Sequence, residues 1–220
     1  AASEIHGWLE QTTHLPATVL RSFMCTFNAN PINGCQGLAK HALRWLKGVK
    51  AKGIMINPDI SDGLTVSTDS DWAGMYTIMG DPRSRTGILC TNNKVPVYCK
   101  SAFQNCKGTQ CDHVEGLLEM LEEEIDSLKL EDDSIIAQSS VEAEAHALGD
   151  GCKILLHMGH LCEEMRIPIK RPLTIYTDSA GAIGFARNNG GAGKMKHIDI
   201  RSAWVQQLRN SDQIVIKHTP

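Results

Sequence analysis

The stretch GLTVSTDSDWAG, Gly63 to Gly74, decides the fold. Leu64 and Val66 alternate with polar residues, and this period of two predicts a β-strand. The strand leads directly into Asp69. Burying a carboxylate on a core strand is costly unless a cation or a hydrogen-bond donor compensates it. The rest of the chain should therefore supply partners for this acid.

Two later segments carry acids in matching positions. The segment SSVEAEAHAL, residues 139–148, places acids at the start of a predicted long helix. The segment LTIYTDS, residues 173–179, predicts a second strand, which ends in Asp178. A strand aspartate, a helix glutamate and a second strand aspartate form the layout of a metal site for phosphodiester chemistry.

The predicted helix holds two glutamates with different roles. Ser139 and Glu142 have the spacing of a capping box, so both are predicted to cap the helix start. Glu144 has no capping role. At about 100° per residue, it falls on the inward-facing side of the helix, near Leu148. Glu144 is therefore the predicted functional acid.

The remaining pattern predicts a mixed sheet with crossover helices. Residues 86–91 and 95–99 predict a hairpin around an Asn92-Asn93 turn. The strand at 173–177 is expected to pair in parallel with the Asp69 strand. Further predicted elements follow the same rules: a helix from 139 to about 166 with a weak point at Asp150-Gly151, helices at 179–187 and 198–208, and a strand at 213–217.

Composition places the chain among ordinary globular proteins. Its 220 residues, 42% hydrophobic and 21% charged, predict one substantial domain with or without an appendage. No apolar run approaches the roughly 20 residues of a membrane span, and no secretory signal is visible, so no membrane partner is expected. The opening AASEIHGWLE does not resemble a natural start, which indicates a fragment of a longer chain.

Eight irregularly spaced cysteines favour reduced, intracellular thiols over disulfides. Cys106, Cys111 and His113 are close enough to suggest zinc, with Cys99 as a distant fourth ligand. No CxxC pair supports such a site. The favoured interpretation is that these cysteines are free thiols, either buried or without a chemical role.

The charge is unevenly distributed. Residues 107–133 hold ten acids and two lysines, a net charge of −8, which leaves +5 on the rest of a chain of net charge −3. A mildly basic body with an acidic insertion is compatible with nucleic acid. Within the insertion, residues 114–128 carry a short heptad pattern. It predicts an amphipathic helix packed on the body, with a partner-binding or dimerising helix as the alternative.

Residues 1–60 have a helical pattern. One predicted helix has a basic face, formed by Lys40, Arg44, Lys47, Lys50 and Lys52. A solvated helix face is the favoured interpretation. The alternative is contact with a phosphate backbone, which needs only such positive charge.

Several segments resemble copia-type LTR retrotransposon polyproteins. STDSDWAG resembles the family's SDADWAG, and SSVEAEAHAL resembles SSAEAEYIAL. IYTDSAGAI, KMKHIDIR and ALRWLKGVKAKG are similar to its L-Y-C-DNQGAI, RTKHIDIR and RYLKGT segments. The five matches follow the family's order and span residues 42–220.

The resemblance implies the ribonuclease H domain of a reverse transcriptase, at 61–220, after the helical end of the connection region at 1–60. Its fold would be a five-stranded mixed sheet with helices on both faces. Asp69, Glu144 and Asp178 would be the catalytic, metal-binding acids, while Asp71 matches an acidic position that is not a ligand. The expected cofactors are two Mg²⁺ or Mn²⁺ ions, which suit hard oxygen ligands.

The implied substrate is the RNA strand of an RNA–DNA hybrid, recognised through 2′-hydroxyls and groove shape. The polymerase domain would lie upstream in the polyprotein, within the cytoplasm, a virus-like particle or the nucleus. Six residues are candidates for backbone contacts, with solvated surface charge as the alternative: Arg83, Arg85, Lys194, Lys196, His197 and Arg201.

Two alternatives stay open at this point. The family places a fourth metal-ligand aspartate after its final strand, and the given sequence stops before that position, at Pro220. A decayed or truncated remnant that keeps the fold and at most binds nucleic acid is therefore the main alternative. An integrase-like nuclease has the same architecture, but the TDSDW and KHIDIR matches favour ribonuclease H.

Overall fold

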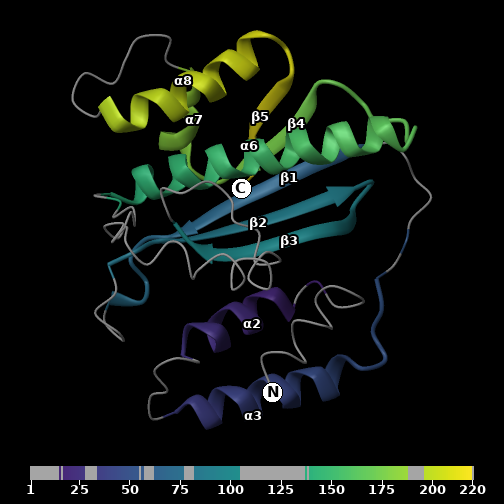
Figure 1. The fold of residues 1–220 in the computed structure, drawn as a ribbon, viewed down its shortest axis with the longest axis vertical. Helices are drawn as coiled ribbons and strands as arrows, with labels where there is room; N and C mark the ends of the chain where they lie inside the picture. The colour runs from purple at the N-terminus through teal and green to yellow at the C-terminus, as the bar shows by residue number, and fades with distance from the viewer. Residues whose placement is uncertain are drawn as a thin grey trace, which may run out of the picture.

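A computed structural model describes residues 15, 17–27, 34–54, 56, 62–76, 82–104, 137, 139–187 and 196–219. Five strands in this part of the chain form one sheet, with the order β3-β2-β1-β4-β5 (Figure 1). Their bounds are β1 Leu64–Asp71, β2 Arg85–Asn92, β3 Val95–Phe103, β4 Leu173–Thr177 and β5 Ile214–His218. Within the described ranges, no helix combines the length and apolarity needed to cross a bilayer.

The sheet is mixed. The pairs β1–β2 and β2–β3 are antiparallel, whereas β1–β4 and β4–β5 are parallel. The predicted hairpin exists, but its turn lies one residue later than predicted. Asn93 and Lys94, not Asn92 and Asn93, have positive φ, because Asn92 pairs with Val95 and closes the ladder. Asn93 also exchanges two hydrogen bonds with Gly63, through its backbone N–H and its side-chain oxygen.

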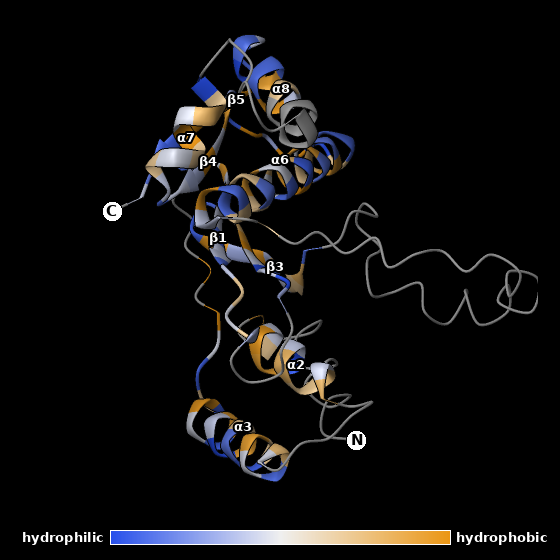
Figure 2. Ribbon diagram, turned by 90° about the vertical axis from the view of Figure 1, so that its left-hand side faces the viewer, coloured by the Kyte–Doolittle hydropathy of each residue, from blue (hydrophilic) through white to orange (hydrophobic). Residues whose placement is uncertain are grey.

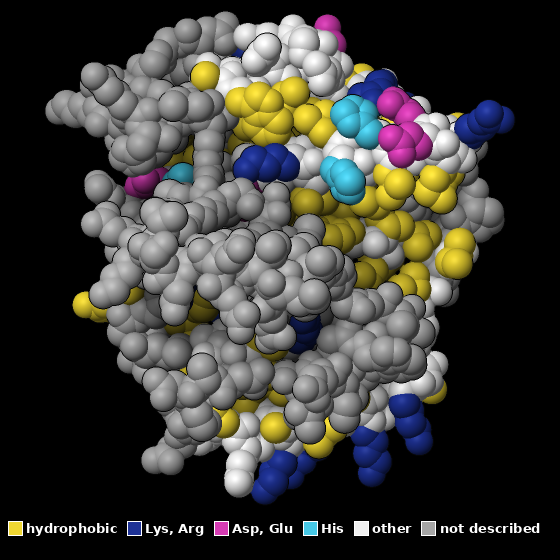
Figure 3. Space-filling model, viewed as in Figure 1, with side chains coloured by type: hydrophobic (Ala, Val, Ile, Leu, Met, Phe, Trp, Pro, Cys, Tyr) yellow, Lys and Arg dark blue, Asp and Glu magenta, His cyan; other side chains and the backbone are white. Residues whose placement is uncertain are grey.

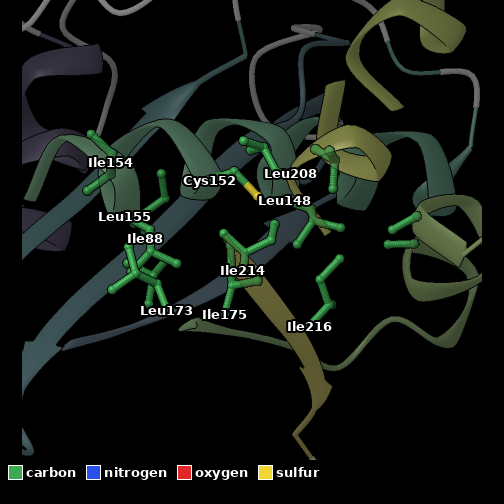
Figure 4. Close-up of a cluster of buried hydrophobic side chains, with 14 of the residues drawn as sticks. Ile88, Leu148, Cys152, Ile154, Leu155, Leu173, Ile175, Leu208, Ile214 and Ile216 are labelled. Carbon is green, nitrogen blue, oxygen red and sulfur yellow. The ribbon is translucent and has the colours of Figure 1, made fainter. Parts of the chain in front are cut away.

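The longest helix, α6 (Ser140–Glu164), crosses one face of the sheet (Figure 1). Its apolar stripe packs on alternate strand residues; Leu148, Cys152 and Leu155 lie over Ile88 and Ile175 in the core (Figure 4). The predicted weak point at Asp150-Gly151 does not interrupt the helix. An added Cβ at Gly151 would lie 2.3 Å from Cγ2 of Thr68, so this glycine lets helix and strand approach closely.

The same face is covered by α7 (Ala180–Arg187) and α8 (Lys196–Asn210). Ile183 of α7 and Leu208 of α8 join the core cluster that includes Ile175 and Ile214. Three of the cysteines, Cys90, Cys152 and Cys162, are buried free thiols. Burial raises the pKa of Cys90 and Cys152 to about 12, so these thiols are packing groups.

Two N-terminal helices, α2 (Ala17–Thr26) and α3 (Cys35–Val49), lie apart from the main core, beyond the β3 side of the sheet (Figure 1). Arg85 of β2 connects α2 to the sheet. Its guanidinium donates hydrogen bonds to the hydroxyls of Ser22 and Thr26 and lies over the rings of Phe23 and Phe103.

Helices therefore lie on both sides of the sheet. Along β2, Ile88 and Cys90 point to the α6 face, so Arg85, at odd spacing from them, belongs to the opposite face, where it meets α2. The predicted architecture, a five-stranded mixed sheet with helices on both faces, is confirmed.

Candidate metal centre

The register of two central strands brings two aspartates to one edge of the sheet. Strands β1 and β4 are parallel, and Thr68 pairs with Thr177. The next residue along each strand direction is Asp69 in β1 and Asp178 after β4. Because parallel strands end at the same edge, the two carboxylates lie side by side. Both side chains are exposed.

Helix α6 brings the third acid to the same place. Ser139 is the N-cap residue, and its hydroxyl accepts a hydrogen bond from the backbone N–H of Glu142 at 3.2 Å. Glu142 is 1% exposed and lies 3.9 Å from His146, measured from Oε1 to Nε2. Glu144 lies on the sheet side of the helix and is 9% exposed.

Asp69, Glu144 and Asp178 form a compact cluster. Each offers one carboxylate oxygen, and these oxygens lie within 4.8 Å of one another. Burial, followed by the charges of Asp178 and Asp69, raises the pKa of Glu144 from its ordinary 4.5 to about 7. A hydrogen bond from the backbone N–H of Ser70 acts in the opposite direction. The cluster is thus electrostatically strained without a cation.

The oxygens of Glu144 provide a test of whether a divalent cation fits. Oε1 accepts the Ser70 N–H at 3.0 Å. Oε2 is buried and has no hydrogen-bond partner in the part of the chain that the structure describes. A buried carboxylate oxygen without a donor, on a residue that clusters with two further carboxylates, suits a hard cation such as Mg²⁺ or Mn²⁺. The three residues therefore fit the expected metal.

Ser70 and Gln104 are structural partners of the cluster that the sequence analysis did not identify. The Nε2 group of Gln104, 4% exposed, lies 2.9 Å from the carbonyl of Ala143, 3.0 Å from Oγ1 of Thr86 and 3.3 Å from Oγ of Ser70. This amide joins β1, β2 and the first turns of α6.

The DWAG end of the opening motif forms a compact turn. Asp71 lies outside the acid cluster, as predicted, and its carboxylate packs over Gly74, where an added Cβ would come within 1.9 Å of Oδ2. The indole of Trp72 donates a hydrogen bond to the carbonyl of Ala137 at 3.0 Å. Trp72 thereby links the end of β1 to the segment that precedes α6.

A histidine that the motifs did not mark lies beside the third acid. Nε2 of His218, in β5, is 2.9 Å from the backbone carbonyl oxygen of Asp178. The contact ties the last strand to the loop that carries Asp178. Ser179 caps α7 on the other side of this loop, because its hydroxyl accepts the N–H of Ala182 at 3.1 Å.

The predicted nucleic-acid contacts differ in their placement. Arg85 is 6% exposed and engaged with α2, so it is not available at the surface. Arg83 is half-buried, with its guanidinium 4.6 Å from the centre of the Phe103 ring. Lys196, His197 and Arg201 belong to α8. Lys194 lies outside the described residues.

Other sequence predictions also fall outside the described residues. These are the acidic insertion at 107–133 with its heptad segment at 114–128, and the candidate zinc ligands Cys106, Cys111 and His113. In the described ranges, the acid triad is the one group of three or more His, Cys, Asp or Glu side chains able to hold a metal.

Comparisons with known proteins add two weak similarities. No protein-family model matches the chain. It resembles the structure of LC11-RNase H1, isolated from compost by a metagenomic approach, at 13% identity and a TM-score of 0.43, over 73% of this chain and 86% of that one. The crystal structure of LC11-RNase H1 in complex with an RNA/DNA hybrid gives 13% identity, a TM-score of 0.41, and coverage of 71% and 85%.

Proposed function

We propose that this chain is a metal-dependent ribonuclease H domain that hydrolyses the RNA strand of RNA–DNA hybrids with two divalent ions. The observation that carries the proposal is the triad of Asp69, Glu144 and Asp178, whose oxygens lie within 4.8 Å of one another at one edge of the sheet. Three converging carboxylates with a partnerless buried oxygen are costly in a protein unless a cation binds them.

Each residue of the triad has a distinct task. Asp69 and Asp178, both exposed, would hold the metal at the open side, and Glu144 would hold it from the buried side through Oε2. Oε1 of Glu144 would keep its hydrogen bond from the backbone N–H of Ser70, which orients the carboxylate. Bound divalent ions would supply water activation and stabilisation of the leaving oxygen in an in-line phosphodiester displacement.

The resting protonation state also follows from this geometry. With a pKa of about 7, Glu144 is substantially protonated at neutral pH when no cation is bound. Because Oε1 already accepts a hydrogen bond, the proton belongs on Oε2. Cation binding requires the carboxylate, so binding should release this proton and strengthen as the pH rises.

The proposed biological context is a copia-type retrotransposon polyprotein with a polymerase domain upstream. Its support is the ordered set of five motif resemblances in the sequence, of which the Asp69, Glu144 and Asp178 motifs converge in space. In this context, helices α2 and α3 correspond to the end of the connection region. An intracellular location is part of the same proposal.

A nucleic-acid-binding module without turnover is the second candidate. The observation that favours it is the number of ligands: the described cluster holds three carboxylates, and two divalent ions each need about six oxygens. Waters and substrate oxygens would have to fill a large share of both shells. The same assay separates the two candidates.

The decisive experiment is cleavage of a 5′-labelled RNA–DNA hybrid with Mg²⁺ or Mn²⁺, using Asp69→Asn and Asp71→Asn side by side. The two aspartates lie two residues apart on one strand, but only Asp69 belongs to the cluster. We expect cleavage by the parent chain and by Asp71→Asn, and none by Asp69→Asn.

Two other outcomes would overturn the nuclease proposal. Hybrid binding without cleavage by the parent at any concentration of either metal would leave the binding module as the function. Cleavage that survives Asp69→Asn would show that the activity does not come from this cluster, or comes from a contaminant.

A further inference from the structure

The N-terminal part of the chain has a charge distribution that the acid cluster does not use. Residues 11–58 contain six Lys and Arg and no Asp or Glu, a net charge of +6 in a chain of net charge −3. Figure 3 shows Lys and Arg side chains at the end of the molecule where Figure 1 places α3, with no acidic side chain among the described residues there. This positive end lies away from the acidic edge of the sheet.

Helix α3 separates its charged and apolar residues onto opposite sides (Figure 2). At about 100° per residue, Lys40, Arg44 and Lys47 fall within about 60° of one another. All three are exposed, and none forms an ion pair with any described residue. They span about 10 Å along the helix axis, which matches about three nucleotide steps of one strand.

The apolar side of α3 is already covered. Ala42 is fully buried, and the other apolar residues of that side are half-buried: Leu38, Trp45, Leu46 and Val49. The neighbour of α3 within the described residues is α2. A helix that lies on a membrane surface needs a free apolar face beside its basic face. Leu43 is the one exposed large apolar side chain of α3, at 51%, and a single such residue does not make an apolar face. The exposed surface of α3 is therefore mainly basic, which favours a highly charged partner over a lipid surface.

Helix α3 is connected to the five-stranded sheet through α2. Arg85 binds two hydroxyls of α2 and packs against Phe23, and its backbone pairs with Asp71, two residues beyond Asp69. The acid cluster is therefore connected to α3 through Arg85 and α2. A polyanion that extends from the cluster past α2 would reach the basic face of α3.

We infer that the face formed by Lys40, Arg44 and Lys47 binds the phosphate backbone of a nucleic acid, outside the metal centre and without sequence preference. The inference rests on the proposed function for the identity of the polyanion, an RNA–DNA hybrid. It concerns binding alone, so it is tested without cleavage. Phosphate neutralisation by Lys and Arg releases counterions, which makes the binding constant depend on salt.

The test compares two triple variants of the full chain. Lys40→Gln/Arg44→Gln/Lys47→Gln removes the three positive charges of the α3 face, and glutamine preserves helix propensity. Lys94→Gln/Arg166→Gln/Lys170→Gln removes the same charge from exposed residues elsewhere. Fluorescence anisotropy with a labelled 18-base-pair hybrid in EDTA measures the dissociation constant between 50 and 300 mM salt. Circular dichroism checks that each variant is folded.

We expect the α3 variant to bind at least tenfold more weakly than the parent at about 150 mM salt. The slope of log K against log salt should become shallower by about 2 to 3, because each phosphate contact contributes about 0.9. The control triple should change the constant much less. Duplex DNA should show the same difference, since the contact is to the backbone.

The inference is overturned if the α3 variant and the control triple give the same constants and slopes. It is also overturned if the parent does not bind the hybrid but binds vesicles containing phosphatidylserine, because the basic face would then be a membrane-binding surface. Its failure differs from failure of the nuclease proposal. If the parent chain binds the hybrid through α3 but does not cleave it, this inference holds and the nuclease proposal is contradicted.

Discussion

The backbone N–H of Ser70 lies 3.0 Å from Oε1 of Glu144, so the strand that carries one acid of the triad directly orients another. The same N–H lies 2.9 Å from Oδ1 of Asp69. One peptide group therefore holds two carboxylates at the edge of the sheet. It offsets only part of their repulsion, since the pKa of Glu144 is still raised to about 7.

Glu144 should make the stability of the metal-free chain depend on pH. Because its folded-state pKa of about 7 exceeds its ordinary 4.5, the folded state binds the proton more tightly. Its contribution is therefore full below about pH 4.5 and is lost as the pH rises through about 7. Glu144→Gln should remove this loss and raise the melting temperature at pH 8.

Urea denaturation in EDTA at pH 5 and pH 8 measures the effect. Asp150→Asn, on the same helix but outside the cluster, is the control and should keep the parent's pH dependence. An equal dependence in Glu144→Gln and the parent would contradict the raised pKa. With 100 times the dissociation constant of Mn²⁺ present, the parent should gain about 2.7 kcal/mol at pH 8, and Glu144→Gln much less.

Gln104 is expected to position the triad. Gln104→Leu would leave the carbonyl of Ala143 and the hydroxyl of Thr86 without their buried donor, at a cost of about 1–3 kcal/mol. It would also loosen the contact between β1 and α6 that aims Glu144. We expect a lower kcat on the hybrid and weaker Mn²⁺ binding by calorimetry, with little change in KM.

Gln206→Leu is the matched control for this effect. Gln206, which is half-buried, also donates from its side-chain amide, to the carbonyl of Phe185 at 2.8 Å, but it joins α8 to α7. The Gln206→Leu variant should be less stable than the parent but should bind Mn²⁺ with unchanged affinity. If both variants lose stability and neither loses affinity, Gln104 has only a structural role.

Two glycines of α6 should respond in opposite ways to alanine. At Gly151 the new Cβ would lie 2.3 Å from Thr68 Cγ2 and 3.0 Å from Ile175 Cδ1, so the helix would have to move off the sheet. Overpacking of this kind costs about 1–3 kcal/mol. At Gly149 nothing lies within 4 Å, and alanine should stabilise the helix by up to about 1 kcal/mol. Chemical denaturation of both variants checks this, and equal effects would contradict the close helix–strand contact.

Arg85 should matter for stability. Arg85→Gln removes a buried guanidinium that bonds to Ser22 and Thr26 and stacks on two rings, so we expect a loss of about 1–3 kcal/mol and faster proteolysis within α2. Arg83 is less buried than Arg85, and its guanidinium lies over Phe103, so Arg83→Gln should cost less. A shallower salt dependence of hybrid binding in Arg85→Gln, with unchanged stability, would instead support a phosphate contact.

The sequence alone determined the local features of this protein. The alternation after Gly63 predicted the strand that carries Asp69, and the spacing of Ser139 and Glu142 predicted the start of α6, where Ser139 is the N-cap residue. These predictions worked because period, capping and hairpin pairing depend on residues close in the chain. Even so, the hairpin turn lay one residue later than predicted, since strand pairing overrode the local preference of Asn92-Asn93.

Only the tertiary structure decided which distant groups meet. Asp69 and Asp178 lie side by side because β1 pairs in parallel with β4, and Gln104 reaches Ser70 and Ala143 because β2 and α6 pack against β1. The burial of Arg85 likewise depends on α2, some 60 residues earlier in the chain. Such contacts follow from the order of strands and the closure of long loops, and no short window of sequence contains that information.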